Sequence, residues 1–346
     1  MNHQRRKVTT SLAVLCTTLL LSVRAQAQTS KKALPPGSKQ PSTLVFGLIS
    51  PRSSAETRAN WEPFVKRLGL AVNLPVELRV YESQGEVVKA FIASEIDIAW
   101  MGNAPAMEVV EAGAGDVFAQ MVTKDGSFGY KSILVVHRNQ VVQSLPELIG
   151  KAKNLRFSDG DPKSTSGYLV PLYFAFNKNG ISDTRAIFKS VETGSHQQNL
   201  MKVAQESADV ATANNEELAF FQRDFPDMAK NVKSVWESPL IPQSPLLWKT
   251  SLPLELKKSI KKFVVNFGAT DAEEKSILLT VNGLSRFRAS GNQQLVPIAD
   301  LEMFKARQAV NNDKSLSEDE RLARINTAIK RGSRLEHLLK FSPPSV

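Results

Sequence analysis

Residues 155–177, with the sequence LRFSDGDPKSTSGYLVPLYFAFN, decide the fold. An apolar strand at 155–157 leads into a loop with glycine and proline, and an apolar run typical of a helix follows from Thr165 to Asn177. The hydroxyl residues at 164–166 stand where that helix starts, and Ser and Thr there accept the free N–H groups of the first turn. A helix start also offers about half a positive charge. The segment therefore predicts a strand–loop–helix unit that can hold an oxyanion, although an ordinary helix cap has the same pattern.

Strands and helices alternate along the rest of the chain. Further strands are expected at 44–49, 76–81, 96–100, 118–122 and 210–212, and helices at 56–68, 87–94, 104–112 and 198–207. This alternation is typical of an α/β fold with largely parallel sheets. Two β-like crossings, at 132–136 and 238–249, flank the middle block. The pattern predicts two lobes joined by a pair of crossovers, with a ligand cleft between them.

These boundaries give a predicted domain organisation. A secretory signal occupies residues 1–27, a flexible tether 28–41, the first part of lobe 1 42–135, lobe 2 136–240, the return to lobe 1 241–310, and a C-terminal helical arm 311–346. The tether is rich in Lys, Pro, Gly and Ser, a composition that favours a flexible chain. The arm is highly charged and helical in pattern, which is typical of a surface helix or an interaction arm.

The first residues have the three parts of an export signal. Basic residues at 5–7 precede an apolar stretch from Leu12 to Val23, and Ala25-Gln26-Ala27 supplies a small-x-small cleavage site. Polar residues interrupt the apolar stretch, which is also short for a membrane span. We therefore expect cleavage after Ala27 and release into the periplasm.

Composition excludes several classes of function. The only cysteine, Cys16, lies inside the predicted signal, so thiol enzymes, iron–sulfur proteins and cysteine zinc sites are excluded for the mature chain. The chain has 44 basic and 34 acidic residues, and four of the basic ones lie within 1–27, which leaves 40 against 34. That small excess suits an anionic ligand or an acidic lipid surface, and no nucleic-acid recognition motif accompanies it.

Motifs for catalysis or for a cofactor are missing from the sequence. There is no Walker-type phosphate loop and no His-Glu-x-x-His or similar metal spacing, so we expect neither a metal nor a cofactor. A Ser164 or Ser166 nucleophile with His196 as its base would make a phosphoester hydrolase, because triads are assembled in space. The nucleophile-elbow pattern Gly-x-Ser-x-Gly is absent, so an enzyme is the weaker hypothesis.

An ordered set of motifs resembles a known family. The motifs are IDIAWMGN at 96–103, GDPKSTSGY at 160–168, WESPLIP at 236–242, FRA at 287–289 and QLVPI at 294–298. In this order and spacing they resemble the periplasmic phosphonate-binding proteins of ABC importers, the PhnD family, from about residue 44 to 305. The resemblance implies a two-lobed, hinge-closing periplasmic binding fold of type II with no catalysis. It also implies delivery of a captured phosphonate, such as aminoethylphosphonate, or of phosphite or phosphate, to a membrane permease.

The resemblance assigns roles to particular residues. Ser164, Thr165 and Ser166 would bind the phosphonate oxygens through hydroxyl and backbone N–H groups. His196 would donate a charge-assisted bond to the dianion and favour its own protonated form. Glu216 would recognise a ligand amine, although a carboxylate there also stabilises a helix start.

The sequence departs from the family pattern at other ligand positions. Gln84 and Met101 stand where members that prefer aminoethylphosphonate have tyrosine, and Ser244 stands where they have aspartate. Each lost hydrogen bond to a charged group is worth about 1.5–3 kcal/mol. We therefore expect phosphonate binding to be retained, and leave the preferred ligand open. A receptor-docking sensor with the same fold and a homodimer through the C-terminal helices also stay open.

Overall fold

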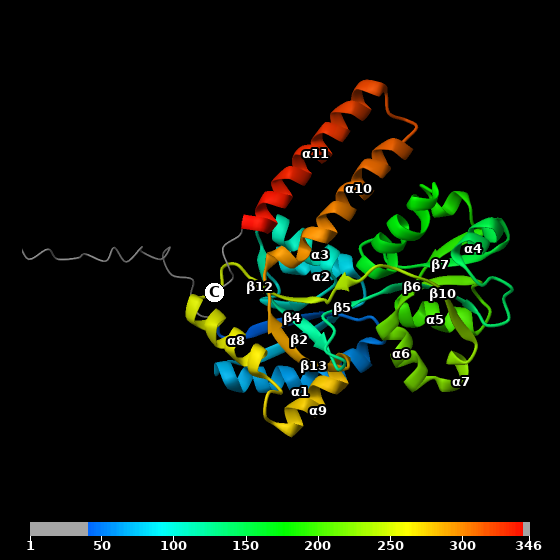
Figure 1. Ribbon diagram of the computed structural model, residues 1–346. Helices are drawn as coiled ribbons and strands as arrows, with labels where there is room; N and C mark the ends of the chain where they lie inside the picture. The colour runs from blue at the N-terminus through cyan, green and yellow to red at the C-terminus, as the bar shows by residue number, and fades with distance from the viewer. Residues whose placement is uncertain (1–40, 342–346) are drawn as a thin grey trace, which may run out of the picture. The chain divides into compact units, whose positions relative to one another are not determined.

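The computed structural model describes residues 41–341. The predicted signal peptide at 1–27 lies outside the described residues, as does nearly all of the tether predicted at 28–41. Among the helices of the described part, none has the length and apolarity that a membrane span requires. The described residues confirm the α/β fold class and form two lobes, each around its own sheet (Figure 1).

The first lobe contains a six-stranded sheet in the order β13-β4-β12-β3-β1-β2. Its strands are β1 (Leu44–Ile49), β2 (Val76–Tyr81), β3 (Ile98–Trp100), β4 (Gly115–Thr123), β12 (Pro245–Lys249) and β13 (Leu284–Ala289). β1 pairs in parallel with β2 and β3, whereas β12 runs antiparallel to both β3 and β4. The covering helices are α1 (Ser54–Val72), α2 (Gln84–Ile92), α3 (Asn103–Glu111), α8 (Leu254–Asn266) and α9 (Ala272–Asn282), with the short η6 (Asn292–Leu295). A large apolar core, rich in aromatic rings, holds these layers together.

The second lobe contains a five-stranded sheet in the order β10-β6-β9-β7-β8. Its strands are β6 (Ser132–His137), β7 (Arg156–Asp159), β8 (Ser190–Thr193), β9 (Val210–Asn214) and β10 (Val232–Glu237). Its helices are α4 (Leu145–Lys151), η1 (Ala152–Asn154), η2 (Thr165–Leu169), η3 (Leu172–Phe176), η4 (Asn177–Asn179), η5 (Thr184–Ala186), α5 (His196–Ala204), α6 (Asn215–Asp224) and α7 (Pro226–Ala229). Separate apolar clusters cover this sheet, because strands buried on both faces alternate their side chains between two cores.

Two short strands join the lobes. β5 (Gly129–Tyr130) pairs antiparallel with β11 (Ile241–Pro242), so the outgoing and returning crossovers lie side by side. The sequence places the first crossing at 132–136 and the end of lobe 1 at residue 135, but all of β6 pairs within the second sheet. The change of sheet therefore lies near Lys131. A strand that crosses between lobes and one that enters a new sheet have the same apolar pattern.

The helix expected at 165–177 forms with widened turns. The Leu169 N–H donates to the Ser164 carbonyl, five residues back, at 3.0 Å. Pro171 has no N–H, so it cannot donate a hydrogen bond to the carbonyl of Gly167, four residues earlier. That carbonyl instead accepts the N–H of Gly160, at 3.1 Å. The proline thus frees a helix carbonyl that ties the preceding loop to the helix start.

Gly160 is required for this contact. A Cβ at this position would lie 2.5 Å from the carbonyl oxygen of Gly167 and 2.6 Å from its Cα. Real Cβ atoms do not approach backbone this closely, so any larger residue would push the loop away from the helix start.

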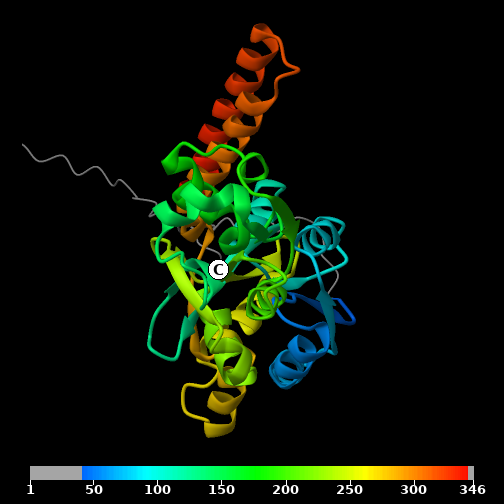
Figure 2. The same ribbon diagram turned by 90° about the vertical axis from the view of Figure 1, so that its right-hand side faces the viewer.

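Two long helices end the described chain. α10 (Val296–Asn312) and α11 (Glu318–Phe341) run side by side (Figures 1 and 2), and they correspond to the predicted helical arm with an earlier start. α10 also contacts the second lobe, since the Tyr173 and Phe304 rings lie 4.8 Å apart. Lys305 Nζ donates to the carbonyl of Pro162 at 3.1 Å. The first helix of the arm therefore packs on the loop and helix that carry residues 160–176.

Candidate functional site

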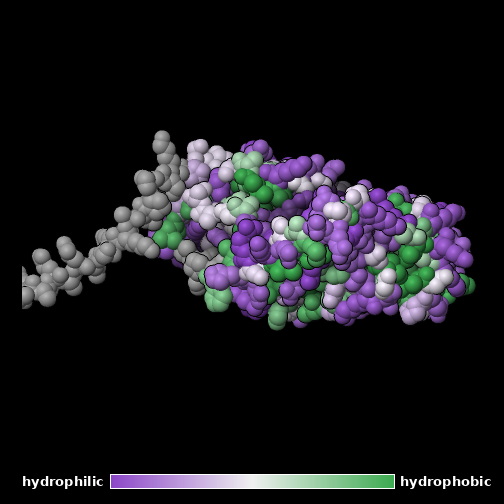
Figure 3. All heavy atoms as spheres, turned by 90° about the horizontal axis from the view of Figure 1, so that it is seen from above, coloured by the Kyte–Doolittle hydropathy of each residue, from purple (hydrophilic) through white to green (hydrophobic). Residues whose placement is uncertain are grey.

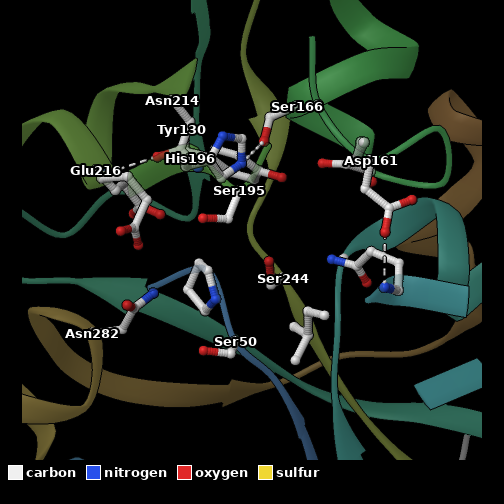
Figure 4. A pocket seen from close by; sticks show the side chains of 18 of the residues that line it. Ser50, Tyr130, Asp161, Ser166, Ser195, His196, Asn214, Glu216, Ser244 and Asn282 are labelled. Atoms are coloured by element: carbon white, nitrogen blue, oxygen red, sulfur yellow. Dashed lines mark hydrogen bonds between the residues drawn. The ribbon is translucent and has the colours of Figure 1, made fainter. Parts of the chain in front are cut away.

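A small cavity lies where the lobes meet. Its volume is about 90 Å³, several times the space of about 10–15 Å³ that one buried water needs, so it suits a small ligand. Figure 4 shows Ser166, Ser195 and His196 on one side of the space and Ser50 and Asn282 on the other. The wall therefore draws on both lobes.

Helix N-termini of the second lobe converge on this cavity. Ser164 caps η2 by accepting the Gly167 N–H at 3.0 Å, and Ser195 caps α5 by accepting the Gln198 N–H at 3.3 Å. Asn214 caps α6 by accepting the Glu217 N–H at 2.8 Å. The three caps all line the cavity. Because each helix start carries a partial positive charge and free N–H groups, the cavity is suited to an anion.

The predicted hydroxyl triplet lies at the cavity, and its members make different contacts. Ser164 caps the helix, whereas the Thr165 hydroxyl accepts the N–H of Ala104, from the first lobe, at 2.8 Å. The Ser166 hydroxyl lies 3.2 Å from Nε2 of His196. Ser166 is therefore the triplet member whose hydroxyl lies against other side chains of the cavity wall, the His196 ring and the Tyr130 phenol.

His196 lines the cavity with one ring nitrogen unpaired. Its Nδ1 is buried and has no hydrogen-bond partner. Burial lowers the pKa of His196 to about 4, so the ring is neutral at pH 7 in the protein without ligand. The protonated ring that the resemblance implies belongs to the state with a bound dianion and stays a prediction. No carboxylate orients Nδ1, so the Ser166–His196 pair lacks the third member that a catalytic triad needs. Within residues 41–341 there is also no cluster of three or more metal-ligating side chains.

Two acidic side chains beside the cavity are uncharged near neutral pH. Glu216 lines the cavity and accepts a hydrogen bond from the Gln243 amide. Asp159 lies at the end of β7 and accepts the Gly160 N–H at 2.9 Å. Burial raises the pKa of each carboxyl to about 8. Neutral carboxyls do not repel an anion, which preserves the positive field of the helix starts.

Of the three residues that depart from the family pattern, two line the cavity and one is buried in the core. Gln84 and Ser244 line the cavity. Met101 does not, because it is fully buried in the apolar core of the first lobe, and the prediction that it contacts the ligand is wrong in this structure. Neighbouring residues at a strand end point in opposite directions, so Trp100 rather than Met101 lines the cavity.

Other lining residues were not predicted from the sequence. They include Ser50, Tyr130, Asp161, Ser195, Asn214 and Asn282. Burial raises the pKa of Tyr130 to about 12, so its phenol is a neutral group at the hinge. Asp161 lies inside the motif at 160–168 and Ser195 directly precedes His196, and these positions could have identified them. Ser50 and Asn282 are far apart in sequence and carry no local signal.

A buried contact crosses between the lobes beside the cavity. Arg52, from the first lobe, donates from Nε to Glu217 Oε2 of the second lobe at 3.0 Å. Its Nη2 also donates to Asn282 Oδ1 at 2.8 Å, and the guanidinium lies 3.7 Å from the centre of the Phe220 ring. Burial raises the pKa of Glu217, and the guanidinium opposes this by favouring the charged carboxylate. The contact therefore ties the two lobes together beside the cavity.

Comparison with known proteins identifies relatives along most of the chain. The family described as "ABC transporter, phosphonate, periplasmic substrate-binding protein" matches residues 46–295. The phosphonates-binding periplasmic protein of Escherichia coli K12 is 39% identical over 286 residues, which cover 83% of this chain and 83% of that protein. A probable ABC transporter phosphite binding protein of Prochlorococcus marinus is 24% identical over 73% of this chain and 86% of that protein.

Solved structures share the fold. The binding protein component of an ABC phosphonate transporter from Pseudomonas aeruginosa has a TM-score of 0.79 at 36% identity, covering 87% of this chain and 99% of that one. PhnD1 from Prochlorococcus marinus, in complex with methylphosphonate, has a TM-score of 0.68 at 23% identity, covering 77% of this chain and 100% of that one. These proteins have the two-lobed architecture of type II periplasmic binding proteins.

Proposed function

The chain belongs to the phosphonate-binding family of periplasmic substrate-binding proteins of ABC transporters, and from this membership we propose how its cavity captures a ligand. The protein is the phosphonate-binding component of such a transporter and not an enzyme. The observation that carries the proposal is the convergence of three helix starts, at Thr165, His196 and Asn215, on one small cavity.

The second lobe binds the phosphonate group first. The N–H groups of the first η2 turn and the Ser166 hydroxyl donate hydrogen bonds to the phosphonate oxygens. Ser164 stabilises the helix start by accepting the Gly167 N–H. A ring N–H of His196 adds a further donor from the neighbouring helix. A bound dianion raises the pKa of His196 from its value of about 4 in the free protein, because a nearby negative charge favours the protonated ring.

The ligand is a small phosphonate such as methylphosphonate or aminoethylphosphonate, with phosphite and phosphate as further candidates. The cavity of about 90 Å³ favours short substituents. Gln84, Ser244 and the neutral Glu216 surround the substituent, so the site lacks a charged clamp for an ammonium group. The affinity of the protein for one of these ligands relative to another therefore depends on hydrogen bonds between the substituent and these uncharged side chains.

Closure of the lobes then prepares the protein for the permease. Bonds between the lobes, such as that from Ala104 N–H to Thr165, exist only when the lobes are closed. A ligand that touches both lobes stabilises that state. The closed surface is what a permease of an ABC importer recognises, after export to the periplasm and cleavage of the signal after Ala27.

The helical arm forms a homodimer in this proposal. Leu322 and Ile329 are 54% and 52% exposed and lie two helical turns apart on α11, on the same face. Seen from above, the surface mixes hydrophilic and apolar residues (Figure 3). Light scattering of the wild type and of Leu322→Glu/Ile329→Glu tests the proposal: a dimer that the variant abolishes supports it, and a monomeric wild type contradicts it.

Titration calorimetry tests the binding function. Protein that starts at residue 28 is titrated with methylphosphonate, aminoethylphosphonate, phosphite, phosphate and sulfate. We expect tight one-to-one binding of at least one phosphorus ligand and weak binding of sulfate. Binding of none of the phosphorus ligands would refute the proposed function for this chain.

A further inference from the structure

One buried polar side chain, Asn199, lies behind the three helix starts that converge on the cavity. It stands in the first turn of α5, and its exposed fraction is 0%. It is not one of the residues that line the cavity. Burial of an amide is unfavourable unless its N–H groups and its oxygen are hydrogen-bonded. The partners of Asn199 therefore show what its burial achieves.

The Asn199 amide is hydrogen-bonded to two strands of the second sheet. Its Nδ2 donates to the carbonyl oxygens of Ser158 and Asp159, on β7, at 3.2 and 3.1 Å. It also donates to the carbonyl oxygen of Thr212, on β9, at 3.0 Å, and its Oδ1 accepts the Ser158 hydroxyl at 2.7 Å. Carbonyls thus surround the nitrogen and a hydroxyl faces the oxygen. Only an amide of this size supplies both the donors and the acceptor that these partners require.

These contacts join three strand–helix units. β7 leads to the η2 start, β8 leads to the α5 start, and β9 leads to the α6 start. β7 pairs in parallel with both β8 and β9, so the three strands point their carboxyl ends toward one edge of the sheet. Asn199 belongs to the second unit and is hydrogen-bonded to strands of the first and the third. It therefore links all three units that present helix starts to the cavity.

The loop before the α5 start lies against the same contacts. The Asp159 carbonyl that accepts the Asn199 amide also accepts the Gly194 N–H, at 3.0 Å. A Cβ at Gly194 would lie 2.4 Å from Asn199 Oδ1, so glycine allows the loop to pass this close to the amide. Gly194 stands two residues before His196, and Asp159 ends the strand that leads to Ser166. A shift of Asn199 would therefore move the His196 end of α5 relative to the segment that carries Ser166.

Resting on the proposed function, we propose that Asn199 is a positioning residue for phosphonate capture, which sets the spacing of the η2 and α5 starts so that donors from both reach one ligand. The Ser166 hydroxyl and the His196 ring come from these two starts and lie 3.2 Å apart. One tetrahedral oxyanion accepts hydrogen bonds from both groups only when this spacing is kept. The affinity for phosphonate thus depends on a side chain outside the cavity wall.

Matched substitutions on α5 test the proposal by calorimetry with methylphosphonate. Asn199→Asp keeps the size of the side chain but places an oxygen against the carbonyls, and it should weaken binding about tenfold or more, the equivalent of one hydrogen bond to the ligand. The control is Val203→Ala, one turn further along the same helix, which removes buried apolar atoms and leaves the amide contacts intact. It should lower the melting temperature and keep wild-type affinity.

Two results of this comparison would overturn the proposal. One is wild-type affinity in Asn199→Asp. The other is an equal loss of affinity in Asn199→Asp and Val203→Ala, which would show that Asn199 acts only through the stability of the lobe. Asn199→Ala removes the amide without adding an opposing oxygen. It takes the place of Asn199→Asp in both measurements if that variant does not fold.

The His196 ring provides a readout that a loss of stability alone does not change. The NMR signal of its Nε2, assigned by comparison with His196→Gln, reports on the contact with the Ser166 hydroxyl. In protein without ligand, well below the melting temperature of each variant, this signal should shift in Asn199→Ala and keep its wild-type position in Val203→Ala. An unchanged signal in Asn199→Ala refutes the positioning role.

Failure of this inference differs from failure of the proposed function. Tight binding of methylphosphonate by the wild type, with the Asn199 variants behaving like Val203→Ala, leaves the proposed function standing and removes only the role of Asn199. A wild type that binds none of the phosphorus ligands removes the proposed function, and this inference with it.

Discussion

The ion pair between Arg52 and Glu217 provides a test of lobe closure. Arg52 belongs to the first lobe and Glu217 to the second, and both side chains are only 4% exposed. Arg52 has another carboxylate partner, Glu56, which lies in its own lobe at 3.3 Å. Glu217→Gln removes a charge across the lobe boundary, whereas Glu56→Gln removes a charge from the same guanidinium within one lobe. The two variants therefore separate closure from local stability.

The expected effect follows from the closed geometry. A hydrogen bond to a charged group contributes about 1.5–3 kcal/mol, and Glu217→Gln weakens such bonds in the closed state alone. In the open state water solvates Arg52, so the change shifts the balance toward open by about that amount. Since every 1.4 kcal/mol is tenfold in affinity, methylphosphonate should bind about 10- to 100-fold more weakly.

Calorimetry and small-angle scattering measure the two parts of this prediction. Glu217→Gln should lose affinity and show a larger radius of gyration without ligand, and Glu56→Gln should match the wild type in both. Wild-type affinity in Glu217→Gln, or the same loss in both variants, would refute the reasoning that this pair reports on closure.

Other predictions concern the loop, the buried acids and the lobe contact. Gly160→Ala should lower methylphosphonate affinity at least tenfold by calorimetry, because its Cβ would lie 2.5 Å from the Gly167 oxygen, while Gly150→Ala, with open space at its Cβ, should bind normally. The pKa of Asp159 is raised to about 8 from 3.8, so the folded protein keeps a proton that the unfolded chain releases, and stability falls as the pH rises between these values. In thermal melts Asp159→Asn should reduce that fall, and an unchanged pH profile would contradict the assignment. Thr165→Val leaves the Ala104 N–H without its acceptor in the closed state and should weaken binding about tenfold by calorimetry; wild-type affinity would show that this bond does not support closure.

Local pattern predicts the elements of this fold and much of its cavity wall. Alternating strands and helices indicate the two α/β lobes, and the hydroxyl residues at 164–166 mark the helix start that faces the cavity. His196, Glu216, Gln84 and Ser244 also line the cavity, as the family resemblance implies, and their contacts with ligand stay predictions.

The remainder depends on three-dimensional packing. Met101 stands at a ligand position of the family pattern, but its side chain is buried in the core. The neighbouring Trp100 lines the cavity instead. Ser50 and Asn282 reach the cavity through different strands and helices, and nothing near either residue in sequence indicates this. The neutral state of His196 follows from burial of its ring, which the sequence does not show.

A crystal structure of the protein with methylphosphonate tests the central claim most directly. We expect closed lobes with the phosphorus atom in the cavity, its oxygens within hydrogen-bond distance of the N–H groups of residues 165 and 166, the Ser166 hydroxyl and the His196 ring. A phosphonate that binds elsewhere, or in this cavity without contacts to the η2 start, would show that the η2 start is not the phosphonate site.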